Sequence, residues 1–167
     1  YEPSEVVCGR FTASTNAELG LEVVAGGLGK AQYAAKTSYL VAHLEGITTL
    51  LCAGTAGAMN EELNVGQIVF SSTVVEHDFA GNLKKNREPR FFSDEELLSR
   101  FETAASTASL PFATGAVASG DEWIASAERA QERVAQHGVI AAAWEGAAAA
   151  KVAKVHDLGF LEVRAIS

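Results

Sequence analysis

Two hydrophobic patterns alternate along this chain and predict strands followed by helices. Apolar residues that run together or recur at every second position indicate strands, and apolar residues three or four positions apart indicate helices. The predicted strands span residues 5–11, 21–25, 47–53, 66–75, 112–118, 139–143 and 160–166. The predicted helices span residues 30–44, 94–108 and 126–137, and a further small-residue helix begins near Trp144. Such alternation is typical of one α/β domain with a mixed sheet.

Turn and cap signals separate these elements. The polar stretch 12–20 joins the first two strands and predicts a hairpin. Gly54-Thr55-Ala56-Gly57 is expected to break the strand before it, and residues 79–93, which have no hydrophobic period, are expected to form a loop. Ser93 followed by Glu96 is a capping-box signature at the start of the next helix.

Composition narrows the class of protein. Of the 167 residues, 48% are hydrophobic and 20% are charged, as in an ordinary globular protein, and no repeat or linker divides the chain into more than one domain. The net charge of −8 and the pI of about 5.0 argue against nucleic acid or an anionic membrane as a partner. Cys8 and Cys52 make no CxxC pair, which fits reduced thiols in a cytoplasmic protein.

One side chain, Glu145, is out of place for a purely structural helix. At roughly 100° per residue it lies about 180° from Lys154 and about 120° from Lys151, among alanines. A carboxylate on that side faces the interior, where an unpaired charge costs several kcal/mol, so it needs a partner, a proton or a ligand. The alternative interpretation is an acid in the first turn, where the helix dipole favours it.

Arg164 is the second candidate. It lies near the carboxyl end of the mostly apolar strand 160–166, which is where open α/β sheets place their ligands. The alternative is a structural ion pair between Arg164 and either Glu162 or Glu145. The sequence leaves both interpretations open.

Two glycine segments suggest close approach of a ligand to the backbone. Gly27-x-Gly29-Lys30 fits neither the dinucleotide fingerprint, because Gln32 replaces the third glycine, nor the P-loop, because Val24 and Ala31 stand at required positions. It still predicts a turn that brings backbone amides near a ligand. The small residues 54–57 allow the same approach, with a tight structural turn as the alternative.

Several common chemistries find no support in the sequence. The four histidines have no ligand spacing, so we expect neither a metal nor another cofactor. No serine lies in a GxSxG motif and neither cysteine has a basic neighbour, which argues against covalent nucleophilic catalysis. Trp123 and Trp144 follow strand ends, where each could face a ligand or simply belong to the core.

Residues with candidate chemistry follow four predicted strands. They are the segments 54–57, 76–78 and 120–124 and the end of the chain at Ser167. With parallel neighbours in one sheet, these segments are expected to gather at one edge, beside Glu145 and the two indoles. Aromatic faces, backbone amides and one acid suit a neutral, flat, hydroxylated ligand better than a phosphate.

Five segments, taken in order, resemble successive blocks of a known family. They are VAGGLGKAQYAAKTSYLV, LLCAGTAGAMNEELNVGQIVFSSTVVEHD, GAVASGDEWI, AAAWEGAAAAKVA and LEVRAIS. They are similar to the nucleoside phosphorylase/nucleosidase family, and within it to the methylthioadenosine/S-adenosylhomocysteine nucleosidases. The resemblance implies a three-layer α/β fold with a mixed central sheet flanked by helices. It also implies cleavage of the N-glycosidic bond of a purine nucleoside by a homodimer or larger homo-oligomer.

The resemblance assigns roles to individual residues. Glu145 matches the ribose-binding glutamate, whose contact with the sugar strengthens as positive charge builds up there. Ser167 matches the serine before the family's catalytic aspartate, and Arg164 completes the catalytic set. The substrate-binding set comprises Leu28, Thr55, Ala56, Gly57, Trp123, Ile124, Ala143 and Trp144.

Three departures from the family pattern limit these expectations. The first strand, with the acid that activates water, is absent before Tyr1, and the C-terminal helix and the catalytic aspartate are absent after Ser167. The chain thus resembles a domain truncated at both ends, and we expect residues 1–167 alone to be inactive or nearly so. The usual Glu-Met-Glu run reads Ala143-Trp144-Glu145, which leaves open which nucleoside fits.

The choice between water and phosphate as the nucleophile depends on Cys52. Phosphorylases that resemble this chain carry an arginine two residues before the glycine that matches Gly54, and here that residue is Cys52. Without a bidentate arginine–phosphate contact, hydrolysis is favoured. A phosphate-dependent purine nucleoside phosphorylase is the alternative enzyme, and a non-catalytic nucleoside-binding or storage protein is the alternative class.

Overall fold

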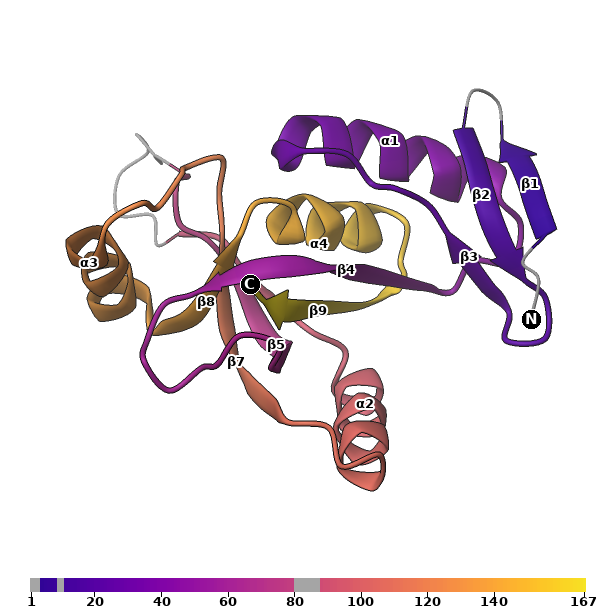
Figure 1. Cartoon of the computed structure of the whole chain (residues 1–167). Helices are drawn as coiled ribbons and strands as arrows, with labels where there is room; N and C mark the ends of the chain where they lie inside the picture. Colours follow the sequence, from indigo (N-terminus) through magenta and orange to yellow (C-terminus); the bar gives the residue numbers. More distant parts are fainter. Residues whose placement is uncertain (1–3, 9–10, 80–87) are drawn as a thin grey trace.

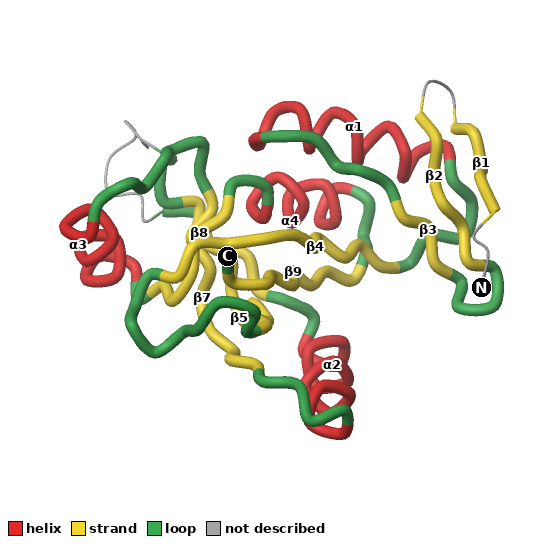
Figure 2. Tube along the Cα trace, in the orientation of Figure 1, coloured by secondary structure: helices red, strands yellow, loops and turns green. Residues whose placement is uncertain are grey.

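The computed structural model describes residues 4–8, 11–79 and 88–167 (Figure 1, Figure 2). Its strands are β1 Ser4–Cys8, β2 Phe11–Asn16, β3 Leu21–Val23, β4 Thr49–Ala58, β5 Ile68–Glu76, β6 Arg90–Phe92, β7 Phe112–Ser119, β8 Val139–Ala143 and β9 Gly159–Ile166. Its helices are α1 Gly29–His43, α2 Glu95–Thr107, α3 Ala127–His137 and α4 Gly146–Val155. The predicted alternation of strands and helices is confirmed, and β2 and β6 are additional strands.

The larger sheet closes on itself. Its strand order is β6-β5-β7-β8-β4-β9, and β9 also pairs with β5, so five of the strands form a ring. β5, β7 and β8 run parallel, and β4 and β9 form a second parallel pair. The two groups join antiparallel, through residues 68–70 with 163–165 and through residues 57–58 with 141–142. The sheet is therefore mixed, as predicted.

Helices flank this sheet (Figure 1). α4 packs against β4 and β9 and α1 covers α4, whereas α2 contacts β5 and β9 from the other side and α3 contacts β8. The buried face of α4 is almost entirely alanine, which lets the helix approach the strands closely. These alanines pack with side chains of three strands in one core cluster, which contains Ala147, Ala149, Ala150, Ala153, Cys52, Val74 and Phe160. The predicted flanked mixed sheet is confirmed.

The first three strands form a separate antiparallel sheet in the order β1-β2-β3. The predicted hairpin is wrong in its extent, because residues 12–16, expected to be a connection, pair with β1 and β3 as β2. Ala13 is fully buried while Thr12 and Ser14 are exposed, so this polar stretch still alternates with a period of two. The actual turn between β2 and β3 is residues 17–20.

Two predicted connections contain strand. β4 does not break at Gly54 but continues to Ala58. Gly54 does not form a turn. It leaves room for the Arg164 side chain, because a Cβ at this position would lie 2.6 Å from Nη1 of Arg164. Within the predicted loop 79–93, β6 pairs antiparallel with β5, and residues 80–87 lie outside the described structure.

Helix starts follow local polar side chains. Asp94 caps α2 by accepting a hydrogen bond from the Leu97 N–H, so the cap is one residue later than the capping-box signature predicted. Ser93 is buried, and its hydroxyl donates instead to the Ser71 carbonyl at 2.6 Å. Ser126 caps α3 through its side chain.

Candidate functional site

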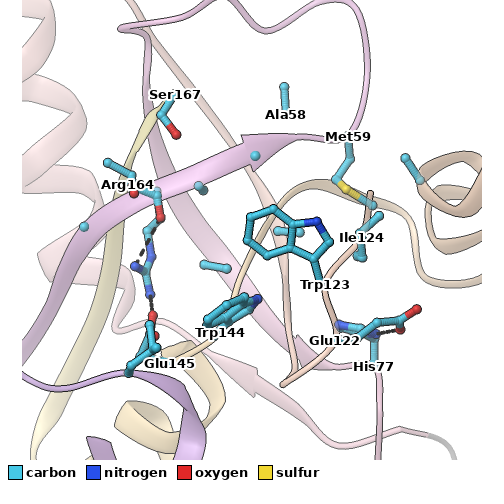
Figure 3. A pocket seen from close by; sticks show the side chains of 18 of the residues that line it. Ala58, Met59, His77, Glu122, Trp123, Ile124, Trp144, Glu145, Arg164 and Ser167 are labelled. Atoms are coloured by element: carbon cyan, nitrogen blue, oxygen red, sulfur yellow. Dashed lines mark hydrogen bonds and ion pairs between the residues drawn. The ribbon is translucent and has the colours of Figure 1, made fainter. Parts of the chain in front are cut away.

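A cavity of about 830 Å³ opens where the carboxyl ends of β4 and β8 meet (Figure 3). The rest of its wall comes from the ends of β5, β7 and β9, the loop before α1, and residues of α1 and α3. All eleven residues predicted from the sequence line it, namely Leu28, Thr55, Ala56, Gly57, Trp123, Ile124, Ala143, Trp144, Glu145, Arg164 and Ser167. The structure therefore brings the whole predicted set together.

The physical reason for this gathering differs from the prediction. The flagged segments were expected to meet because neighbouring strands are parallel, yet β4 is antiparallel to β8. The two strands pair through only two residues each, 57–58 with 141–142, close to the carboxyl end of each strand. The carboxyl ends of β4 and β8 therefore cross. This crossing brings the parallel pair β4 and β9 and the parallel strands β5, β7 and β8 to the same cavity.

Glu145 turns its carboxylate toward the cavity wall from the N-cap position of α4. Its side chain is 13% exposed. Oε2 lies 3.3 Å from Nη2 of Arg164, and Oε1 accepts a hydrogen bond from the Gly29 N–H at 3.1 Å. The prediction placed Glu145 inside the helix, which is wrong because α4 begins at Gly146. Its carboxylate is held in this direction by the Gly29 N–H and by Arg164.

Arg164 is a buried guanidinium shared by two acids. It is 4% exposed, and its Nε donates to Oε1 of Glu162 at 2.7 Å while Nη2 faces Glu145. Burial lowers the pKa of Arg164, but the neighbouring groups, Glu162 foremost, together outweigh burial and raise the pKa, so the guanidinium stays charged. Both ion pairs considered from the sequence are present; Glu145 and Arg164 line the cavity, whereas Glu162 lies behind Arg164 and is fully buried.

Two neutral groups lie beside this guanidinium. Nη2 of Arg164 donates to the Cys52 Sγ at 3.4 Å, and Tyr33 lines the cavity nearby. Burial raises the pKa of Cys52 to about 12 and also raises the pKa of Tyr33. Both groups are therefore uncharged at neutral pH. Among the described residues that line the cavity, Arg164 carries the positive charge. Its guanidinium is already paired with the carboxylates of Glu145 and Glu162.

Another part of the wall is aromatic and apolar. Trp123 and Trp144 pack edge to face, with ring centroids 5.8 Å apart, and Met59 and Ile124 lie beside them (Figure 3). Trp123 is 75% exposed, so the interpretation of this residue as plain core is wrong. An exposed indole beside a cavity offers its face to a planar ring.

The glycine turn before α1 forms a rim of the cavity. Residues 26–28 line it, and the Gly29 N–H reaches the carboxylate at the start of α4. Lys30 turns elsewhere, since its ammonium lies 3.1 Å from Glu76 and 2.6 Å from Asp78. The turn thus supplies one backbone amide, that of Gly29, to Glu145, while its lysine belongs to a separate ion-pair cluster.

Among the lining residues outside the predicted set are Tyr33, Met59, His77 and Glu122. His77 and Glu122 lie in segments that the sequence flagged, so their place directly after a strand was a usable signal. Met59 follows the unforeseen extension of β4. Tyr33 carried no signal, because an aromatic residue on a helix usually packs in the core.

Glu122 holds the loop that carries Trp123. Its carboxylate accepts hydrogen bonds from Arg129 at 2.5 Å and from Arg133 at 2.7 Å, both on α3. These arginines lower the pKa of Glu122 from 4.5 to about 2. Because the folded protein binds this proton less readily than the unfolded chain, the stabilisation is complete above pH 4.5 and disappears as the pH falls to about 2.

Glu122→Gln is therefore expected to flatten the acid limb of the stability curve by about 1 kcal/mol, since the ion pairs are partly exposed. Urea unfolding at several pH values between 2 and 7 measures this effect. The control is Glu102→Gln, which removes a carboxylate bonded to the Thr114 hydroxyl rather than to an arginine. Curves for the wild type and for Glu122→Gln that remain parallel would contradict the assignment.

Metal-ligating side chains do not cluster in the part of the chain that the structure describes. Cys8 and Cys52 are both free thiols, and both are buried. At the cavity, the described residues offer carboxylates, a guanidinium, backbone amides and aromatic rings.

Comparison with known proteins gives the family. The sequence pattern of the Phosphorylase superfamily matches residues 5–167. The chain belongs to this superfamily. The 5′-methylthioadenosine/S-adenosylhomocysteine nucleosidase of Haemophilus ducreyi is 32% identical over 151 residues, which are 84% of this chain and 64% of that protein. The chain thus spans less than two thirds of the length of this superfamily relative.

Two solved structures share the fold with this superfamily member. A candidate methylthioadenosine nucleosidase from Weissella paramesenteroides is 25% identical, with a TM-score of 0.87 over 100% of this chain and 75% of the other. The futalosine hydrolase of Helicobacter pylori is 21% identical, with a TM-score of 0.88 over 99% of this chain and 77% of the other. The second likeness concerns the fold alone.

Proposed function

We propose that this protein hydrolyses the N-glycosidic bond of a purine nucleoside and releases the base. The observation that carries the proposal is the Glu145 carboxylate, held by Arg164 at the wall of a cavity that also presents an exposed indole. The nucleosidase of Haemophilus ducreyi supports a substrate of the methylthioadenosine/S-adenosylhomocysteine type.

In this proposal Glu145 binds the ribose hydroxyls. The Gly29 N–H and Arg164 fix the direction of its carboxylate, which leaves the remaining lone pairs to accept hydrogen bonds from the sugar. As the bond to the base breaks, the sugar becomes cationic, and its attraction to the carboxylate increases. An interaction that is stronger in the transition state than in the ground state raises kcat. Thr55, Ala56 and Gly57 lie beside the sugar.

Trp123 and Ile124 flank the base in this proposal. Trp123→Ala is expected to raise KM about ten- to a hundredfold, because stacking of a base on an aromatic ring contributes about 1–3 kcal/mol. The free energy of unfolding is expected to stay unchanged, since the indole is 75% exposed. Steady-state kinetics with methylthioadenosine measures the first effect and thermal unfolding the second.

A matched control for this prediction is Phe92→Ala. Phe92 is 76% exposed, on β6, and does not line the cavity. We expect this variant to leave KM unchanged. Equal changes of KM in both variants would show that Trp123 acts through general stability rather than through contact with the base.

Water is the nucleophile that the charges at the cavity favour. Cys52 is neutral where related phosphorylases are expected to carry an arginine, and Arg164 is already held by two carboxylates. Lys30 binds Glu76 and Asp78 instead of facing the cavity. A phosphate dianion in the cavity would therefore be repelled by the Glu145 carboxylate. Among the described lining residues, it would find no unpaired cation to bind it.

The test is release of adenine from methylthioadenosine by the full-length protein, with and without inorganic phosphate. Release that does not depend on phosphate supports hydrolysis, and strict dependence on phosphate would replace the proposal with phosphorolysis. Tight binding without release of the base would instead identify a nucleoside-binding or storage protein.

The remaining assignments are proposals based on the family resemblance. Leu28, Ala143 and Trp144 contact the substrate, and Ser167 takes the place of the serine that stands before the catalytic aspartate in the family. Residues 1–167 form one nucleosidase-like domain that functions in a homodimer or larger homo-oligomer in the cytoplasm. Among the described helices, none is long and apolar enough to cross a membrane. Light scattering of the full-length protein measures the oligomeric state.

A further inference from the structure

The proposed function leaves one buried carboxylate, Glu162, without a role. Glu162 lies in the middle of β9 and is 0% exposed. Its Oε1 accepts a hydrogen bond from Nε of Arg164, whereas its Oε2 finds no hydrogen-bond partner among the described residues. A buried carboxylate oxygen without a partner is costly, so a purely structural position in this strand favours an apolar side chain.

The start of α4 keeps room for this carboxylate. A Cβ at Gly146 would lie 2.3 Å from Oε2 and 2.5 Å from Oε1 of Glu162. The next four residues, 147–150, are all alanine and all buried, so the helix carries a methyl group at each of these positions but not at the contact with Glu162. Gly146 and Glu162 therefore form a matched pair.

The distances show how the charge of Arg164 is divided. Its Nε lies 2.7 Å from Oε1 of Glu162, and its Nη2 lies 3.3 Å from Oε2 of Glu145. The shorter ion pair, with Glu162, balances the positive charge of Arg164. The second carboxylate, that of Glu145, then leaves a net charge of about −1 at the cavity wall. Burial raises the pKa of Glu162, and the Arg164 guanidinium offsets this shift only in part, so the negative charge of Glu162 depends on its 2.7 Å contact with Arg164.

We propose that Glu162 is a positioning residue, which holds the Arg164 guanidinium and balances its charge so that Glu145 keeps its own negative charge for the sugar. This inference rests on the proposed nucleoside hydrolysis. The effect of Glu162 is greatest when the sugar becomes cationic, so it acts on kcat more than on KM.

The first test is Glu162→Gln in the full-length protein, with methylthioadenosine as substrate. This change keeps the shape of the side chain and an oxygen for Nε of Arg164, and removes the charge. We expect kcat to fall about ten- to a hundredfold with KM nearly unchanged. This is the effect on the transition state of removing one negative charge that lies several ångströms from the cationic sugar. The Tm is expected to fall, because the buried Arg164 loses one of its two carboxylate partners, so kcat is compared at a temperature at which both proteins are folded. An unchanged kcat would overturn the proposal.

A matched control separates this role from general loss of a buried acid. Glu76 is 3% exposed and pairs with Lys30 and Lys151, and it does not line the cavity. Glu76→Gln is expected to lower the Tm and to keep kcat near the wild-type value. If the wild type releases no base, the proposed function fails. If the wild type and Glu162→Gln release base equally, the positioning role alone fails.

A second test uses the contact between Gly146 and Glu162. Gly146→Ala in the wild type is expected to lower the Tm by about 5 °C and to lower kcat, because the methyl group displaces the carboxylate. In the background of Glu162→Val, the same change is expected to leave the Tm unchanged, while kcat stays low because the charge is missing. Equal losses of Tm in both backgrounds would contradict the pairing of these two residues.

Discussion

Glu145→Gln is expected to lower kcat about a thousandfold while it changes the free energy of unfolding by less than about 1 kcal/mol. Glutamine preserves the acceptor for the Gly29 N–H and removes the charge that attracts the cationic sugar. Stability changes little because Arg164 keeps its shorter ion pair with Glu162. Single-turnover kinetics of the full-length protein and urea unfolding measure the two quantities.

Glu76→Gln is expected to affect stability rather than activity, and therefore serves as a control for Glu145→Gln as well. Its carboxylate accepts hydrogen bonds from Lys30 and Lys151, so its loss is expected to cost about 2 kcal/mol of stability and little activity. If Glu145→Gln instead loses stability and activity in proportion, Glu145 is a structural partner of Arg164 and does not bind the sugar.

Arg164→Leu is expected to cause the largest loss of stability, about 3–5 kcal/mol. The change leaves Glu145 and the fully buried Glu162 without their shared cation. It also removes the hydrogen bond from Nη1 to the Thr55 carbonyl, which joins β9 to β4. Urea unfolding measures the loss, and base release is expected to be abolished at the same time.

Two companion variants give this prediction its internal test. Arg164→Leu combined with Glu162→Leu is expected to recover most of the stability, because a buried ion pair can be replaced by apolar side chains, and to remain inactive. Arg164→Lys is expected to fall between these cases, since an ammonium cannot hold two carboxylates in the fork geometry of a guanidinium. A loss below about 1 kcal/mol in Arg164→Leu would show that the acids adapt without a cation.

The sequence predicts those parts of the fold that local interactions determine. α1 and α3 begin and end within about one residue of the prediction, because a glycine turn precedes α1 and Ser126 caps α3. β7 and β9 were predicted from mostly apolar runs, which suit strands buried in a closed sheet. The site residues were found because they follow these strands and because their segments resemble a family.

Other features depend on tertiary contacts that one sequence does not display. The extension of β4 through Gly54 reflects the guanidinium of Arg164, which is 110 positions later in the chain. The polar β2 owes its strand form to pairing on both edges with β1 and β3. The matched pair of Gly146 and Glu162 brings together two elements whose register is visible only in three dimensions.

The thiol of Cys52 has a consequence for chemical probes of this site. It lies on the cavity wall 3.4 Å from Arg164, and burial raises its pKa to about 12. Alkylating agents and peroxides react with thiolates, and at neutral pH only about one such thiol in 10⁵ is ionised. This thiol is therefore expected to resist oxidation, and an inhibitor directed at the cavity would gain nothing from a cysteine-reactive group.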